Sequence, residues 1–184
     1  MHNEKDENRL IYAILLCFIL AALLGLPADF YGGGWSKQII YKSVDALFIT
    51  GSILVAMKLA REGWDLAAAG YTVLSIAWGV LFFAKDFQEQ NMGYEILISA
   101  FYFLLPSMIL IAFYEPFPLF IKILCIISVI PSFIGLIYIK QGRPLADYQI
   151  WVKINYQAVH IISLFWGFFF YRQHKKNNRN QVNR

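Results

Sequence analysis

Hydrophobic residues run almost without interruption through six stretches of the chain, and polar residues gather in the short segments between them. The six stretches cover roughly residues 9–26, 40–60, 65–84, 94–114, 118–138 and 149–171. A helix needs about 20 apolar residues to cross the hydrocarbon core of a bilayer. Inside lipid, each backbone polar group of such a helix is satisfied within the helix itself. The pattern therefore predicts an all-α, polytopic integral membrane protein, built as a bundle of six transmembrane helices.

The polar ends of the chain lie outside these stretches. We expect residues 1–8 to form a cytoplasmic N-terminal tail, 9–171 a six-helix transmembrane domain, and 172–184 a basic, disordered cytoplasmic tail. The last segment is rich in Asn and Gln and cannot form a core. It carries five cations and no acid: Arg172, Lys175, Lys176, Arg179 and Arg184.

Composition supports the membrane interpretation. Hydrophobic residues make up 59% of the 184 residues and charged residues 15%, compared with about 25% charged in an average soluble domain. A soluble domain of this size cannot bury so much apolar surface. The net charge of +4 comes from the C-terminal tail rather than from a basic face, so no nucleic-acid partner is expected. Cys17 and Cys125 lie in separate stretches without a C-x-x-C pair, which leaves thiol redox and thiolate metal chemistry unsupported.

The distribution of cations predicts an orientation. Six spans place both termini on one side, and a juxtamembrane basic cluster is typical of the cytoplasmic side, where it contacts anionic lipid head groups. With the tail inside, ten lysines and arginines lie on the cytoplasmic side and six on the other side. Half of the ten belong to the tail. We therefore expect a bacterial-type inner membrane protein with both termini cytoplasmic.

Three ionisable residues lie early in the three spans that run inward in this topology. They are Asp45, Glu95 and Lys153. At 1.5 Å per residue, all three fall within roughly 10 Å of the outer boundary of the membrane. Charged groups at this depth are costly, and by default they mark a functional site. Two carboxylates and one ammonium at a common depth predict a partly desolvated ion network.

Helical spacing extends this polar face inward. Lys153, Gln157 and His160 are four and three residues apart, and Glu95, Ser99 and Tyr102 follow the same rhythm, so each set shares one helix face. The fifth stretch adds Ser132. These positions predict a polar cleft that opens outward, with His160 near its floor. The expected substrate- or ion-binding residues are Asp45, Glu95, Tyr102, Ser132, Lys153, Gln157 and His160.

A structural interpretation of the same residues stays open. The three charged residues can belong to the head-group zone, where lysine extends its ammonium to water. Small and hydroxylated residues on one face also hold packed membrane helices together. His160 can be a neutral, hydrogen-bonded core residue, or a proton relay or ligand-binding group, because histidine titrates near physiological pH.

A short pattern recurs in the third and sixth stretches. Ser-x-x-Trp-Gly-x-x-Phe occurs at 75–82 and again at 163–170. Three helices followed by three similar ones would form a weak 3+3 inverted repeat, as in many transporters. The second and fifth stretches show little likeness, and aromatic-rich spans match each other easily.

The motifs of familiar enzyme classes are missing from the sequence. It contains no H-E-x-x-H, G-x-S-x-G, Walker A or G-x-G-x-x-G pattern, and we expect no catalytic residue, cofactor or metal.

The leading hypothesis is a small membrane transporter, channel or substrate-binding membrane subunit for a small polar ligand or ion. The alternatives are a non-enzymatic accessory or signalling membrane subunit, and a membrane enzyme acting on a lipid or prenyl substrate. A homo-oligomer or a partner subunit would suit a bundle this small.

Overall fold

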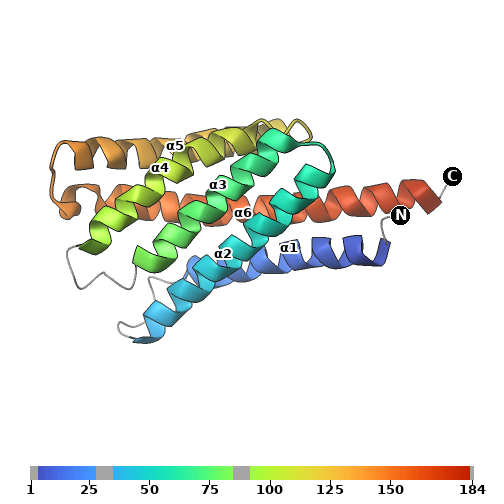
Figure 1. Cartoon of the computed structure of the whole chain (residues 1–184), viewed down its shortest axis with the longest axis horizontal. Helices are drawn as coiled ribbons and strands as arrows, with labels where there is room; N and C mark the ends of the chain where they lie inside the picture. Colours follow the sequence, from blue (N-terminus) through green and yellow to red (C-terminus); the bar gives the residue numbers. More distant parts are fainter. Residues whose placement is uncertain (1–3, 28–34, 85–91, 183–184) are drawn as a thin grey trace.

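Helices make up all the regular structure in the part of the chain that the computed structural model describes, residues 4–27, 35–84 and 92–182. The predicted all-α fold with six helices is confirmed. In Figure 1, α1 begins and α6 ends at the same end of the bundle. The helices are α1 (Glu4–Gly25), α2 (Trp35–Arg61), α3 (Asp65–Ala84), α4 (Met92–Ala112), α5 (Leu119–Lys140) and α6 (Leu145–Val182).

The last helix is longer than the hydrophobic pattern predicted. α6 has 38 residues, which at 1.5 Å per residue extend about 57 Å, well beyond the roughly 30 Å of a hydrocarbon core. Its final turns project past the rest of the bundle (Figure 1). The sequence predicted disorder from residue 172, whereas the structure is helical to Val182. The reason is tertiary contact, because the buried side chain of His174 hydrogen-bonds to Asn8 on α1.

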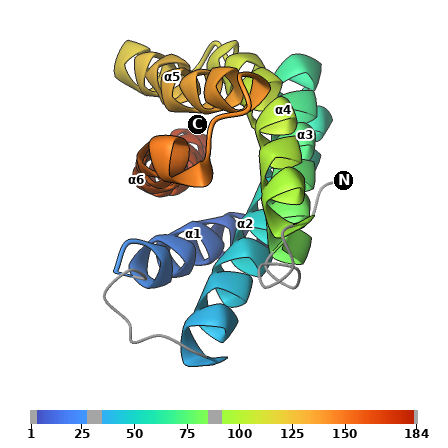
Figure 2. The ribbon, with the colours of Figure 1, turned by 90° about the vertical axis from the view of Figure 1, so that its left-hand side faces the viewer.

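The helices pack in chain order, and α6 also packs against α1, so that the six close into a ring. The end view in Figure 2 shows α6 between α1 and α5, across from α3 and α4. Aromatic side chains of different helices contact one another inside the bundle. The ring of Trp166 on α6 lies 5.9 Å from that of Phe18 on α1 and 5.1 Å from that of Tyr71 on α3. One continuous apolar core therefore joins α6 to the helices that face it.

The connection between α2 and α3 is a tight turn that the sequence signals directly. Gly63 has a φ of 79°, in the left-handed region that glycine adopts without steric cost. The amide of Trp64 donates to the carbonyl of Leu59 at 2.9 Å, as in a Schellman motif. α3 then begins at Asp65, whose carboxylate suits the positive end of the helix dipole. A glycine and an acidic residue therefore form the boundary between α2 and α3.

Four of the described helices are long and apolar enough to cross a membrane: Asp6–Gly25, Lys37–Arg61, Asp65–Ala84 and Leu119–Lys140. A shorter apolar stretch, Ser99–Ala112, lies in α4. Large apolar side chains also cover the outside of the bundle; on α5, Ile126, Ile130 and Phe133 are 47–57% exposed. An apolar exterior of this extent fits lipid rather than water.

Candidate functional site

A carboxyl group is buried inside the bundle. Asp45 lies in α2 and has no exposed surface. Tyr41, Asp45 and Phe48 are spaced four and three residues apart, so they share one face of the helix. Phe48 is fully buried as well, and its ring contacts α6. Because burying an ionisable group is costly, Asp45 is the first candidate for a functional rather than a packing role.

The imidazole of His160 is the second buried ionisable group in this region, and it too has no exposed surface. Its Nδ1 lies 2.6 Å from the carbonyl oxygen of Tyr156, one turn earlier in α6. A carbonyl oxygen only accepts, so Nδ1 donates and carries a hydrogen. In the neutral ring, the nitrogen that can take up a further proton is therefore Nε2.

Aromatic rings surround this imidazole. The centroids of Phe48, Trp78 and Tyr156 lie 4.8, 5.6 and 4.2 Å from that of His160. Phe48 and Trp78 also stack on each other at 4.1 Å. On the remaining side, Gly25 at the end of α1 is so close that a Cβ atom there would clash with Nε2. The proton-accepting nitrogen therefore faces the backbone of α1.

Asp45 and His160 belong to the same layer of the bundle. On α2, Asp45 lies between Tyr41 and Phe48. The ring of Tyr41 is 5.8 Å from that of Tyr156, and the ring of Phe48 is 4.8 Å from that of His160. One of these contacts lies one turn before Asp45 along α2, and the other lies one turn after it. The face of α2 that carries the carboxyl group is therefore connected to the face of α6 that carries the imidazole through aromatic rings. We call Asp45, Phe48, Trp78, Tyr156 and His160 the buried layer.

Gln157 is a third predicted residue that lies beside this layer. Its side-chain amide donates to the carbonyl oxygen of Leu26 at 3.4 Å, which is one residue beyond α1. The contact connects the end of α1 to α6 next to the Gly25–His160 contact. The cleft predicted from the sequence opened to the outside, whereas Asp45 and His160 are both enclosed in this structure.

The other predicted site residues lie elsewhere. Ser132 is buried on α5, where its Oγ accepts a hydrogen bond from the side-chain amide of Asn155 on α6. Tyr102 is 64% exposed on the outside of α4, because α4 buries Leu104, Met108 and the residues near them. Lys153 is exposed on α6. Glu95 falls within α4, but its side chain lies outside the described part of the structure.

Several members of the site were missed by the sequence interpretation. Phe48 and Tyr156 belong to apolar helices in which aromatic residues are common, so nothing in the pattern distinguishes them. Trp78 was noted only as part of the repeated pattern, not as a site residue. Gly25 could not be identified as a site residue either, because many helices end at a glycine. Asn155 could have been found, since an amide inside an apolar span usually bonds across a helix interface. The sequence interpretation passed over it in favour of the charged residues.

Among the described residues, no group of three or more His, Cys, Asp or Glu side chains is placed to hold a metal ion. The chemistry available in the buried layer is proton exchange at one carboxyl group and one imidazole. No known protein family, curated protein or solved structure matches this chain.

Proposed function

We propose that all six helices cross a membrane, with both termini on the cytoplasmic side of a bacterial inner membrane. Two features support this topology. α1 begins and α6 ends at one end of the bundle (Figure 1), as an even number of spans requires. Basic residues gather at that same end, with Lys58 and Arg61 in the last turn of α2 and Lys122 in the first turns of α5. A cytoplasmic excess of cations is typical of inner membrane proteins.

Within this topology we propose a small transporter, channel or substrate-binding membrane subunit that uses the buried layer as a proton-binding site. The single observation that supports it is the complete burial of Asp45 and His160 in one layer between α2 and α6. Ionisable side chains in transmembrane helices are rare and costly, and they mark ion or proton pathways. A carboxyl group and an imidazole are side chains that can take up and release a proton.

The contacts of the layer suggest how a proton would reach it. Nε2 of His160 faces Gly25, and the amide of Gln157 holds the end of α1 through Leu26. Separation of this helix end from α6 would uncover Nε2 first. Proton binding there would then place a positive charge among the aromatic rings of Phe48, Trp78 and Tyr156. In this proposal, a substrate or ion enters only while the end of α1 is displaced.

The 3+3 inverted repeat remains part of this proposal. Trp78 and Trp166, at matching positions of the repeated pattern, are both buried in the core. Ser75 and Ser163 also match, and each hydroxyl donates to the carbonyl three residues earlier at 2.7 Å. These likenesses support related roles for α3 and α6, which both contribute to the buried layer.

Proton flux into liposomes tests the proposed function. The full-length chain is reconstituted with the pH-sensitive dye pyranine inside, and an outward potassium gradient with valinomycin drives protons inward. We expect flux above that of empty liposomes, with a dependence on pH. Asp45→Asn and His160→Ala should both abolish it at unchanged expression, because each removes one of the two proton-binding groups.

Asp65→Asn is the matched control, because Asp65 is an exposed aspartate at the start of α3, and its flux should equal that of the wild type. Full flux in both Asp45→Asn and His160→Ala would reject the proton-coupled role. Wild-type liposomes no more permeable than empty ones would also reject it, and would favour the second candidate.

The second candidate is a non-enzymatic accessory or signalling subunit, and the projecting end of α6 favours it. Arg172, Lys175, Lys176 and Arg179 follow a spacing of three, one and three residues, so they share one face, and they line a common surface hollow. Such a face suits anionic head groups or an acidic partner subunit. Deletion of residues 173–184 tests this role: loss of the protein's activity in cells while the helical bundle stays intact supports the accessory role.

A further inference from the structure

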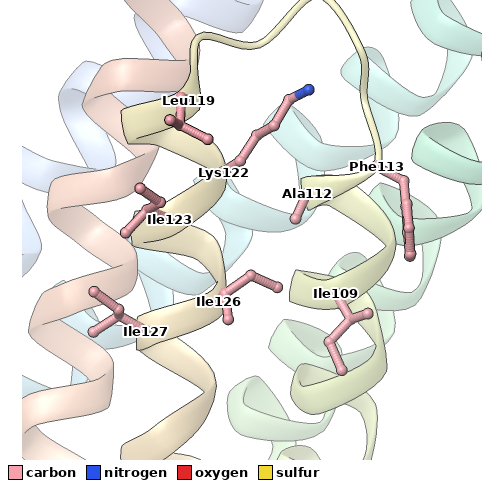
Figure 3. Close-up of a pocket in the computed structure, with 8 residues that line it drawn as sticks. All are labelled: Ile109, Ala112, Phe113, Leu119, Lys122, Ile123, Ile126 and Ile127. Atoms are coloured by element: carbon pink, nitrogen blue, oxygen red, sulfur yellow. The ribbon is translucent and has the colours of Figure 1, made fainter.

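A groove of about 390 Å³ lies on the outside of the bundle, between the end of α4 and the start of α5 (Figure 3). This volume is in the range of small-molecule sites. The apolar walls are 41–72% exposed. They are formed by Ile109 and Phe113 near the end of α4 and by Leu119, Ile123, Ile126 and Ile127 on α5.

One cation belongs to this otherwise apolar groove. Lys122 lies between the two helix ends, and Figure 3 shows its amine directed towards the α4–α5 connection. Its Nζ donates to the carbonyl oxygen of Glu115 at 3.1 Å. An ammonium group has three hydrogens, and this bond uses one. The carboxylate of Glu115 is not part of the groove, and the residue is exposed.

The groove is polar near the start of α5 and apolar one turn further along this helix. Lys122 lies in the first turns of α5, whereas Ile126 and Ile127 lie one turn further along the helix. From Leu119 to Ile127 the groove extends about 12 Å along α5, at 1.5 Å per residue. α5 is one of the helices that can cross a membrane. In a bilayer, the lysine would stand at the head-group level and the isoleucines at the level of the acyl chains.

We propose that this groove binds an anionic phospholipid, with one acyl chain along the isoleucines of α5 and its phosphate group at Lys122. A second copy of the chain would fill the apolar walls, but it would also have to place a carboxylate at the ammonium, because a buried charge without a counter-charge is costly. A zwitterionic lipid would bring its own cation beside the lysine. An anionic phospholipid complements both parts of the groove, with its head group at Lys122 and its acyl chain at the apolar walls. The site is independent of the buried layer and of the proposed proton pathway.

Lipid retention by the intact protein tests this proposal. The full-length chain in mild detergent is titrated with phosphatidylglycerol or with phosphatidylcholine of the same acyl chains, and bound lipids are counted by native mass spectrometry. We expect phosphatidylglycerol to bind about fivefold more tightly, the preference that one lysine contact confers. Lys122→Gln should remove this preference, and Ile126→Trp should reduce the retention of both lipids by filling the groove.

Two matched variants control for binding elsewhere, including at the basic end of α6. Lys140→Gln removes an exposed cation at the far end of α5, and Ile130→Trp enlarges an exposed residue outside the groove. Both should bind lipid as the wild type does. Equal affinity for the two lipids, or an unchanged preference in Lys122→Gln, would overturn the proposal. A wild-type dimer that Ile126→Trp dissociates would also overturn it, by identifying the groove as a contact between copies.

Discussion

The backbone of Gly25 lies against the imidazole of His160, so close that a Cβ atom at position 25 would lie within 3.0 Å of Nε2 and 3.1 Å from Cε1. The ring has little room to move away. Its Nδ1 bonds to the carbonyl of Tyr156, and the rings of Phe48 and Trp78 lie on other sides. A glycine at the end of one helix therefore determines how tightly α1 covers the proton-accepting nitrogen on α6.

Gly25→Ala should accordingly destabilise the bundle. The added methyl group forces either α1 or the imidazole to shift, and overpacking of this kind typically costs 1–3 kcal/mol, so we expect a loss of about 2 kcal/mol. The measurement is reversible unfolding in mixed micelles, followed by circular dichroism. Gly79→Ala is the control, because a Cβ atom there meets nothing within 4 Å. Its stability should match the wild type or exceed it by up to about 1 kcal/mol, since alanine favours the interior of a helix more than glycine does. Equal stability of the two variants would contradict the close contact.

The hydrogen bond between Asn155 and Ser132 should contribute to the packing of α5 against α6. Hydrogen bonds between membrane helices contribute about 0.6 kcal/mol on average and up to about 2 kcal/mol. We expect a coupling energy in this range from a double-mutant cycle of Ser132→Ala and Asn155→Ala, measured by unfolding in micelles.

Ser128→Ala provides the matched cycle for that prediction. Ser128 is buried on the same helix, but its hydroxyl donates to the carbonyl of Cys125 within α5. Its coupling to Asn155→Ala should be close to zero. A coupling as large as that of Ser132 would mean that Asn155 responds to any loss of volume in α5, rather than to one hydrogen bond.

Contacts with α1 should keep the projecting end of α6 helical. The Oδ1 of Asn8 accepts hydrogen bonds from the imidazole of His174 and, at 3.5 Å, from the amide of Asn178. Removing the shared acceptor in Asn8→Ala should let the last turns fray, with faster amide hydrogen exchange in residues 174–182. Lys175→Ala, an exposed position on the same turn, should leave the exchange rates unchanged. Slow exchange in Asn8→Ala would show that the helix persists without this contact.

The contribution of Gly63 to stability should come from its backbone conformation alone. Its φ is 79°, and a Cβ atom there would contact nothing within 4 Å. A left-handed conformation costs residues other than glycine about 1–2 kcal/mol, so Gly63→Ala should lower the unfolding free energy by about that amount. Gly63→Asn should cost less, because asparagine tolerates this region. If the two variants were equally stable, the turn would have to adopt another conformation.

The site could be predicted only in part. Asp45 and His160 were found because an ionisable group in an apolar run is conspicuous, and both are buried. Tyr102 was included because it continues the four-and-three rhythm of Glu95 and Ser99, yet it lies on the outside of α4. Periodicity states which residues share a face but not which way that face turns. In a helix that is apolar on every side, hydrophobicity does not decide this orientation either.

Features that depend on neighbouring residues could be read from the sequence alone: six helices, several of them long apolar runs, and the gathering of cations near the C-terminus. These follow from segment length and local charge. Three features came from the three-dimensional structure: the ring contacts between the Asp45 face of α2 and the His160 face of α6, the hydrogen bond from Asn155 to Ser132, and the helical conformation of α6 beyond Arg172. Such pairings join residues more than 20 positions apart. They depend on how rings, glycines and small side chains fit together in three dimensions, and no local pattern encodes that fit.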